Sequence, residues 1–98
     1  MFTITATIRA RPDEHSTVRN ALLSVVEAVR ETEPQTVCYF VTQSADDPCV
    51  FTTFERFVDR AAMERHNASE AVARFVRDAG SHLDGAIVIH AGEELASK

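Results

Sequence analysis

Apolar and polar residues alternate along the first ten residues of the chain. Such a period of two predicts a half-buried β-strand over residues 1–10. Between about Glu14 and Glu31 the apolar residues recur at spacings of three and four, which predicts an amphipathic helix. Asp13 is placed to cap the start of this helix. Pro34 ends it, because a proline disfavours helical geometry in the residue before it.

The middle of the chain predicts a β-hairpin. Residues 36–43 are rich in β-branched and aromatic side chains, and residues 51–57 alternate in the manner of a half-buried strand. The stretch between them, residues 44–48, consists of turn formers and includes Pro48. Two antiparallel strands joined by a short loop are therefore expected here.

A helical region follows the hairpin. Asp59 is placed to cap a helix, and Ser69 followed by Glu70 is placed to cap a second helical stretch. The residues expected on the inward sides of these helices are Ala62, Met63, His66, Val72, Phe75 and Val76.

A last strand is predicted over residues 86–91, after breaks at Gly80 and Gly85. The elements then follow the order β-α-β-β-α-β of the ferredoxin-like fold, an α+β fold with helices on one face of a four-stranded antiparallel sheet. We expect one domain over residues 1–92 and a flexible tail at 93–98. We expect a second copy to cover the other face of the sheet, as a homodimer.

The composition narrows the classes of partner. The chain has 98 residues, 45% hydrophobic and 26% charged, as expected for one globular domain. The net charge of −5 and the scattered basic residues argue against nucleic acid and against an anionic membrane surface. No apolar run reaches the length of a membrane span, and no signal-type segment opens the chain. We therefore expect a cytoplasmic protein.

Metal and nucleotide sites are not expected from the sequence. Cys38 and Cys49 form neither a zinc pattern nor a C-x-x-C pair, and we expect both to be free thiols. His82 and His90 lie far along the chain from His66, and no carboxylate completes a ligand motif with them. With only three glycines, the chain has no glycine-rich nucleotide loop.

His66 is the ionisable residue of an otherwise apolar helix side. An imidazole that titrates near neutral pH could accept a proton from a ligand. The alternative is a buried structural histidine, bonded to a backbone carbonyl or to Glu55, and periodicity alone favours this alternative. Tyr39 could hydrogen-bond a substrate oxygen, although tyrosines at strand centres more often pack. Glu55 is expected to form an ion pair with Arg9 or Arg56.

Several of these residues occur together in one known pattern. Its members are Glu33-Pro34, Thr36, Tyr39, Asp47-Pro48, Phe51 to Phe57 with Glu55 inside it, Asp59, Ala62, His66 and Ser69. With this pattern, nearly the whole chain resembles the antibiotic biosynthesis monooxygenase family, which includes quinol monooxygenases and polyketide-tailoring oxygenases. Two positions depart from the family: Gln35 replaces a usual glycine, and Ala71 or Val72 replaces a frequent second histidine.

The resemblance implies a dimeric α+β barrel with a ligand pocket between the sheet and the helices of each subunit. It also implies that molecular oxygen oxidises a quinol or a polycyclic phenol, with no metal, flavin or other cofactor. His66 is our candidate for the catalytic residue, and Tyr39, Phe51, Glu55, Met63 and Phe75 are our candidates for binding the small aromatic substrate. The alternatives are a non-oxygenase enzyme, such as an isomerase or cyclase, and a small-ligand-binding stress-response module.

Overall fold

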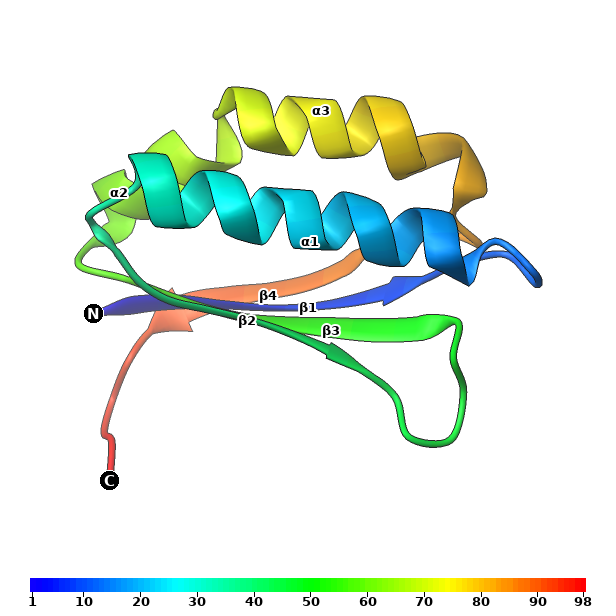
Figure 1. Cartoon of the computed structure of the whole chain (residues 1–98). Coiled ribbons are helices and arrows are strands. Elements are labelled where there is room, and N and C mark those ends of the chain that lie inside the picture. Colours follow the sequence, from blue (N-terminus) through cyan, green and yellow to red (C-terminus); the bar gives the residue numbers. More distant parts are fainter.

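Helices cover one face of a four-stranded antiparallel sheet in the computed structural model, which describes all 98 residues (Figure 1). This arrangement confirms the predicted ferredoxin-like fold class. The elements, in chain order, are β1 (Phe2–Arg9), α1 (His15–Thr32), β2 (Thr36–Gln43), β3 (Val50–Phe57), α2 (Arg60–Asn67), α3 (Glu70–Ala79), the 3-10 turn η1 (Gly80–His82) and β4 (Val88–Glu93).

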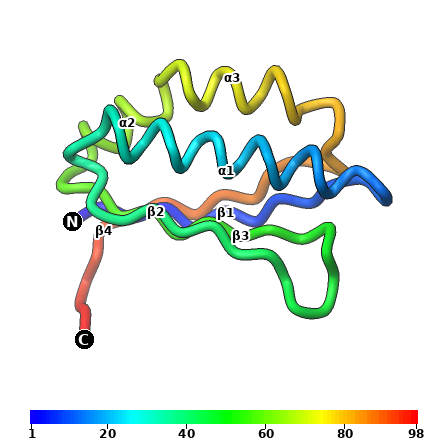
Figure 2. Tube along the Cα trace, in the orientation of Figure 1, coloured from blue at the N-terminus to red at the C-terminus, as the bar shows by residue number.

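The strands lie in the order β2-β3-β1-β4, so that the first and third strands form the centre of the sheet. In the register between β1 and β3, Phe2 lies opposite Phe57 and Ile8 lies opposite Phe51. The trace in Figure 2 shows that the C-terminal residues leave β4 on the side of the sheet away from the helices. That side is called the bare face below.

The core between helices and sheet consists of two apolar clusters. The larger cluster lies under α1 and α3 and includes Leu22, Phe51 and Phe75. The smaller lies at α2 and includes Phe57 and Met63. The protein has three buried polar residues, and they lie on β3 and α2: Thr53, Glu55 and His66.

Large apolar side chains are exposed on the bare face. Phe40 of β2 and Phe54 of β3 lie opposite each other, with 58% and 42% of their surfaces exposed and their ring centroids 6.3 Å apart. Val88 of β4 is 54% exposed. A face with this composition is typical of a surface that another protein covers.

Two of the three predicted helix caps are present. The caps at Asp59 and Ser69 are confirmed, because each side chain accepts a hydrogen bond from the backbone N–H of the third residue of its helix. The cap at Asp13 is wrong. Asp13 has a left-handed backbone, with φ of 67°, in a turn that Glu14 N–H closes on the carbonyl of Arg11, and α1 begins only afterwards.

The end of the chain also differs from the prediction. The last strand covers Val88–Glu93, so it starts and finishes two residues later than the predicted 86–91. The two cysteines are free, as predicted. None of the helices is long and apolar enough to cross a membrane.

Candidate active site

A cavity lies where the central strand carries its smallest inward-facing side chain. Ala6 presents only a methyl group on the helix side of β1, between the larger Ile4 and Ile8. Its neighbours across the sheet are Thr53 on β3 and Ile89 on β4. The space left over these residues is a cavity of about 100 Å³ between sheet and helices.

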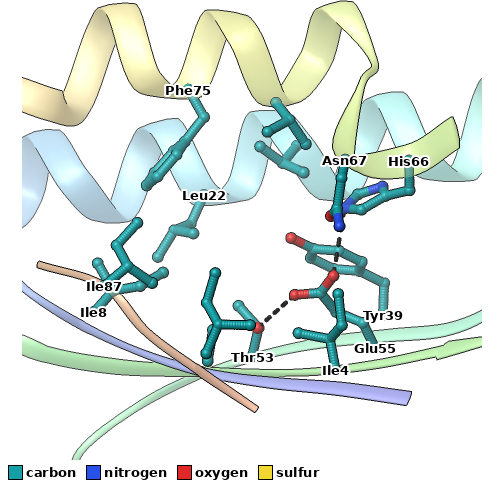
Figure 3. A pocket seen from close by; sticks show the side chains of 14 residues that line it. Ile4, Ile8, Leu22, Tyr39, Thr53, Glu55, His66, Asn67, Phe75 and Ile87 are labelled. Atoms are coloured by element: carbon teal, nitrogen blue, oxygen red, sulfur yellow. Dashed lines mark hydrogen bonds and ion pairs between the residues drawn. The ribbon is translucent and has the colours of Figure 1, made fainter. Parts of the chain in front are cut away.

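The cavity has a polar end and an apolar end (Figure 3). Tyr39, Thr53, Glu55, His66 and Asn67 form the polar end. At the opposite end, the lining side chains include Ile8, Leu22, Phe75 and Ile87. An elongated ligand with a polar group at one end fits such a site in one orientation.

His66 lies between two carboxylates at the polar end. Its Nδ1 is 2.8 Å from Oε1 of Glu33, and its Nε2 is 3.3 Å from Oε1 of Glu55. The other carboxylate oxygen of Glu55 accepts a hydrogen bond of 2.6 Å from Oγ1 of Thr53. The side chains of His66 and Glu55 are only 2% and 7% exposed. With a carboxylate at each ring nitrogen, the histidine is arranged to donate from both, as an imidazolium does.

The electrostatic balance at His66 favours its charged form. Burial by itself lowers the pKa of the imidazole, because the cation loses hydration. The hydrogen bond with Glu55 and the negative charges of Glu33 and Glu55 outweigh burial, and the pKa of His66 is raised above its ordinary value. Two carboxylates and one imidazolium together leave a net negative charge beside the cavity.

Tyr39 shows how this environment acts on a phenol. Its ring centroid lies 5.3 Å from that of His66. Burial raises the pKa of Tyr39, and the charges of Glu55 and Glu33 raise it further. Tyr39 therefore keeps its proton and can donate it in a hydrogen bond. A phenol bound nearby would lie beside the same negative charges, which disfavour its anion. It would therefore ionise only if a group in the site takes up its proton.

Four elements bring the cluster together. Asp59 caps α2, whose buried side carries Ala62, Met63 and His66. Glu33 directly follows α1, and Pro34 prevents the helix from continuing past it. Oε1 of Glu33 also accepts a hydrogen bond of 2.8 Å from Oγ1 of Thr36 at the start of β2, which fixes the carboxylate beside the ring.

The cluster also reaches the outside of the molecule. Glu33 and His66 border a second, polar hollow of about 330 Å³, together with Gln35, Arg65 and Ser69. The imidazole therefore separates the apolar cavity from an outer polar surface. No group of three histidine, cysteine, aspartate or glutamate side chains is placed to hold a metal ion.

Most of the chain matches one known protein family. Residues 1–78 match the family model described as "Antibiotic biosynthesis monooxygenase". The chain belongs to this family. No curated protein sequence matches the chain.

Solved structures agree with the assignment to the antibiotic biosynthesis monooxygenase family. A crystal structure described as an antibiotic biosynthesis monooxygenase is 25% identical, with a TM-score of 0.89 over 98% of this chain and 100% of that one. A Pseudomonas aeruginosa protein is 30% identical, with a TM-score of 0.87 over 97% and 94% of the two chains. A Mycobacterium tuberculosis protein, 24% identical, shows the same fold, with a TM-score of 0.89 over 98% and 96%.

The predicted site residues of this family member fall into two groups. Tyr39, Glu55, His66 and Phe75 line the cavity together. Phe51 and Met63 do not line it; each is packed in one of the two core clusters. The structural pairing of His66 with Glu55 that the sequence left open is present.

The predicted ion pair between Glu55 and an arginine is wrong. Arg9 pairs with Asp47 and Arg56 pairs with Glu94, both on the bare face. Alternation along β3 accounts for this, because Glu55 points toward the helices and the neighbouring Arg56 points away from them.

Sequence reasoning did not assign Glu33, Thr53 or Asn67 to the site. In the sequence, Glu33 stands out only as the residue before a helix-ending proline, although it belongs to the family pattern. Thr53 could have been found from its spacing, because residues two apart on a strand share a face and Glu55 was already a candidate. Asn67 carried no signal beyond its position next to His66.

Proposed function

We propose that this family member is a cofactor-independent monooxygenase that oxidises a quinol or related phenol with molecular oxygen. The observation that carries the proposal is the buried pair of Glu55 and His66 at one end of an otherwise apolar cavity. Such a cavity can surround an aromatic ring with apolar side chains, and the pair supplies a group that exchanges protons with a hydroxyl on that ring.

The chemistry requires no electron source besides the substrate. The substrate O–H bond breaks and its proton passes to the pair, which leaves an electron-rich anion. The anion gives one electron to oxygen, and the two radicals combine to form a C–O bond to a peroxide. The pair returns its proton to the peroxide. The C–H bond at the oxygenated carbon then breaks as the O–O bond breaks, so that one oxygen atom stays on the ring as a carbonyl and the other leaves as water with the returned proton and the former C–H proton. A hydroquinone and oxygen thus yield a hydroxyquinone and water.

Proton transfer is assigned to Glu55 and His66 acting together. Both ring nitrogens of His66 face carboxylates, so the atom that receives the substrate proton is a carboxylate oxygen of Glu55. The imidazolium lies 3.3 Å from this carboxylate through its Nε2 and holds it in place. Tyr39 donates a hydrogen bond to the substrate oxygen, and Phe75 packs against the ring. Phe51 and Met63 support the walls from within the core.

One specific observation favours a second function at the same place. A proton donor and a proton acceptor lie side by side in the cluster, which is what an isomerase or cyclase needs in order to move a proton between two carbon or oxygen atoms. Such an enzyme does not use oxygen.

Oxygen uptake with reduced quinones decides between the two functions. The purified protein is expected to accelerate oxygen consumption above the spontaneous rate, with one oxygen atom of labelled O₂ found in the product by mass spectrometry. Substrate conversion that proceeds equally well without oxygen would contradict the monooxygenase and favour the isomerase or cyclase.

A further inference from the structure

The size of the cavity limits the ligand. An engineered apolar cavity of about 150 Å³ accommodates benzene, and sites for drug-sized ligands measure about 300 Å³ or more. The cavity over Ala6 measures about 100 Å³. It therefore has space for most of one six-membered ring, and a second fused ring does not fit inside it.

The apolar end of the cavity is closed by residues of the main core. Leu22 is 2% exposed and Phe75 is 7% exposed, and both pack in the larger apolar cluster. Such a close-packed wall does not move aside for a larger ligand without loss of core contacts.

The opening lies beside β4. Ile89 lines the cavity on the helix side of this strand and is nevertheless 57% exposed. Ring substituents can extend into solvent here. The net negative charge of the cluster with Glu33, His66 and Glu55 disfavours substituents that are themselves anionic.

We propose that the substrate is a single-ring phenol or hydroquinone without an acidic substituent, bound with one hydroxyl at Glu55 and its ring over Ala6. Phe75 and Ile87, at the apolar end, set the size limit. The phenolic nature of this ligand rests on the proposed function; its size rests on the cavity.

Three substitutions change the cavity in opposite directions. Phe75→Leu and Ile87→Ala shorten side chains at the apolar end and so enlarge the cavity. Ala6→Val places a larger side chain in the floor of the cavity and so makes it smaller, and valine is a residue that a central strand accepts. Val76→Ala is the matched control, because Val76 is on the same helix as Phe75 but is 59% exposed and does not line the cavity. Thermal melting of each variant establishes that it is folded before its activity is compared.

The substrates to compare are methylhydroquinone and a naphthohydroquinone, with spontaneous oxidation subtracted. Wild-type kcat/KM is expected to favour the single ring by about tenfold or more, as for other pockets that exclude added carbon atoms. Phe75→Leu and Ile87→Ala should shift this ratio toward two rings by about tenfold. Ala6→Val should lower turnover of both substrates, and Val76→Ala should leave both unchanged. A wild type that prefers the larger quinol, or a ratio that neither enlarged variant changes, would overturn the inference.

Binding tests the size limit without turnover. Phenol and 1-naphthol are titrated into the same variants, with side-chain NMR shifts of Tyr39 and Phe75 as the readout. An affinity ratio of 1-naphthol to phenol that rises in both enlarged variants supports the limit, and an unchanged ratio contradicts it. If no quinol causes oxygen uptake but binding is still size-selective, the proposed monooxygenase function is wrong and the size limit of the cavity stands.

Discussion

The two faces of the sheet use the same strands for opposite purposes. Along β3, Thr53 and Glu55 point toward the helices and are buried, whereas Phe54 and Arg56 point to the bare face. On the helix side, polar groups are buried among apolar ones. On the bare face, an aromatic ring is exposed among hydroxyl and charged groups.

The ion pairs on the two faces of the sheet differ in their burial. Each face has a cation paired with carboxylates: His66 with Glu33 and Glu55 on the helix side, and Arg56 with Glu94 on the bare face. The first cluster is almost fully buried, so loss of one partner leaves a charge without hydration. The second pair remains partly in water, which replaces a lost partner at little cost.

The largest expected effect tests the chemical role of the helix side. Glu55→Gln keeps the size of the side chain and can still hydrogen-bond Thr53 and His66, but it removes the proton acceptor. We expect turnover of a quinol to fall by about 10²–10⁴-fold, the range for loss of a general base. Thermal melting gives the folded fraction of each variant, so that turnover can be expressed per folded molecule. Glu27→Gln, an exposed carboxylate paired with Arg30, is the control.

His66→Ala separates a catalytic from a structural role in the same assay. If the imidazole only satisfies buried carboxylates, the variant should lose about 3 kcal/mol or more of unfolding free energy, because Glu33 and Glu55 lose their common partner. Its folded fraction should then turn over at the normal rate. That result would remove His66 from the catalytic pair, whereas a slow, folded variant would place it there.

The next prediction concerns the bare face, which we propose is covered by a second copy of the chain. Phe40 and Phe54 are expected at the centre of an interface of roughly 2,000 Å² or more. Replacing both with lysine should weaken association by about 2 kcal/mol or more per ring, as for interface hot spots. Sedimentation should give the mass of two chains for the wild type and of one chain for the double variant. Val76→Lys on the exposed side of α3 should remain paired, and a monomeric wild type at micromolar concentration would contradict the dimer.

The pH dependence of stability tests the charge of His66 between Glu33 and Glu55. Because the folded-state pKa of His66 is raised, its stabilisation is complete below the ordinary pKa near 6.5 and is lost as pH rises through the raised value. Glu33→Gln should lower the unfolding free energy by about 1–3 kcal/mol at pH 6, through loss of a charge-assisted hydrogen bond. The difference between wild type and variant should shrink in alkaline urea titrations. A difference that stays the same from pH 6 to alkaline pH would show that the imidazole is neutral in the folded protein.

The fold was predictable because its signals are local. Alternation on the strands, the caps at Asp59 and Ser69, and the break at Pro34 each depend on neighbouring residues. The Asp13 prediction failed because one side chain can serve either a cap or a left-handed turn, and the sequence does not distinguish these.

The site was only partly predictable because it depends on distant parts of the chain. His66 and Glu33 are 33 residues apart and meet through the end of α1 and the buried side of α2. Periodicity places His66 on an inward side but does not reveal which carboxylate faces it. The presence of the cavity follows from Ala6 together with its neighbours across the sheet, and no single element carries that information.

The smallest expected effect comes from the ion pair on the bare face. The hydrogen bond from Arg56 lowers the pKa of Glu94, so this pair stabilises the fold above the ordinary pKa of about 4.5, and its contribution is lost as pH falls through the lowered value. This pH dependence is opposite in sign to that of His66. Glu94→Gln should therefore lower the melting temperature slightly at pH 7, and this difference should shrink as pH falls below about 4.5. If a second copy covers this face, the pair lies beside the interface, and the effect at pH 7 should increase with protein concentration. A change that is independent of concentration would mean that Glu94 contributes only within its own chain.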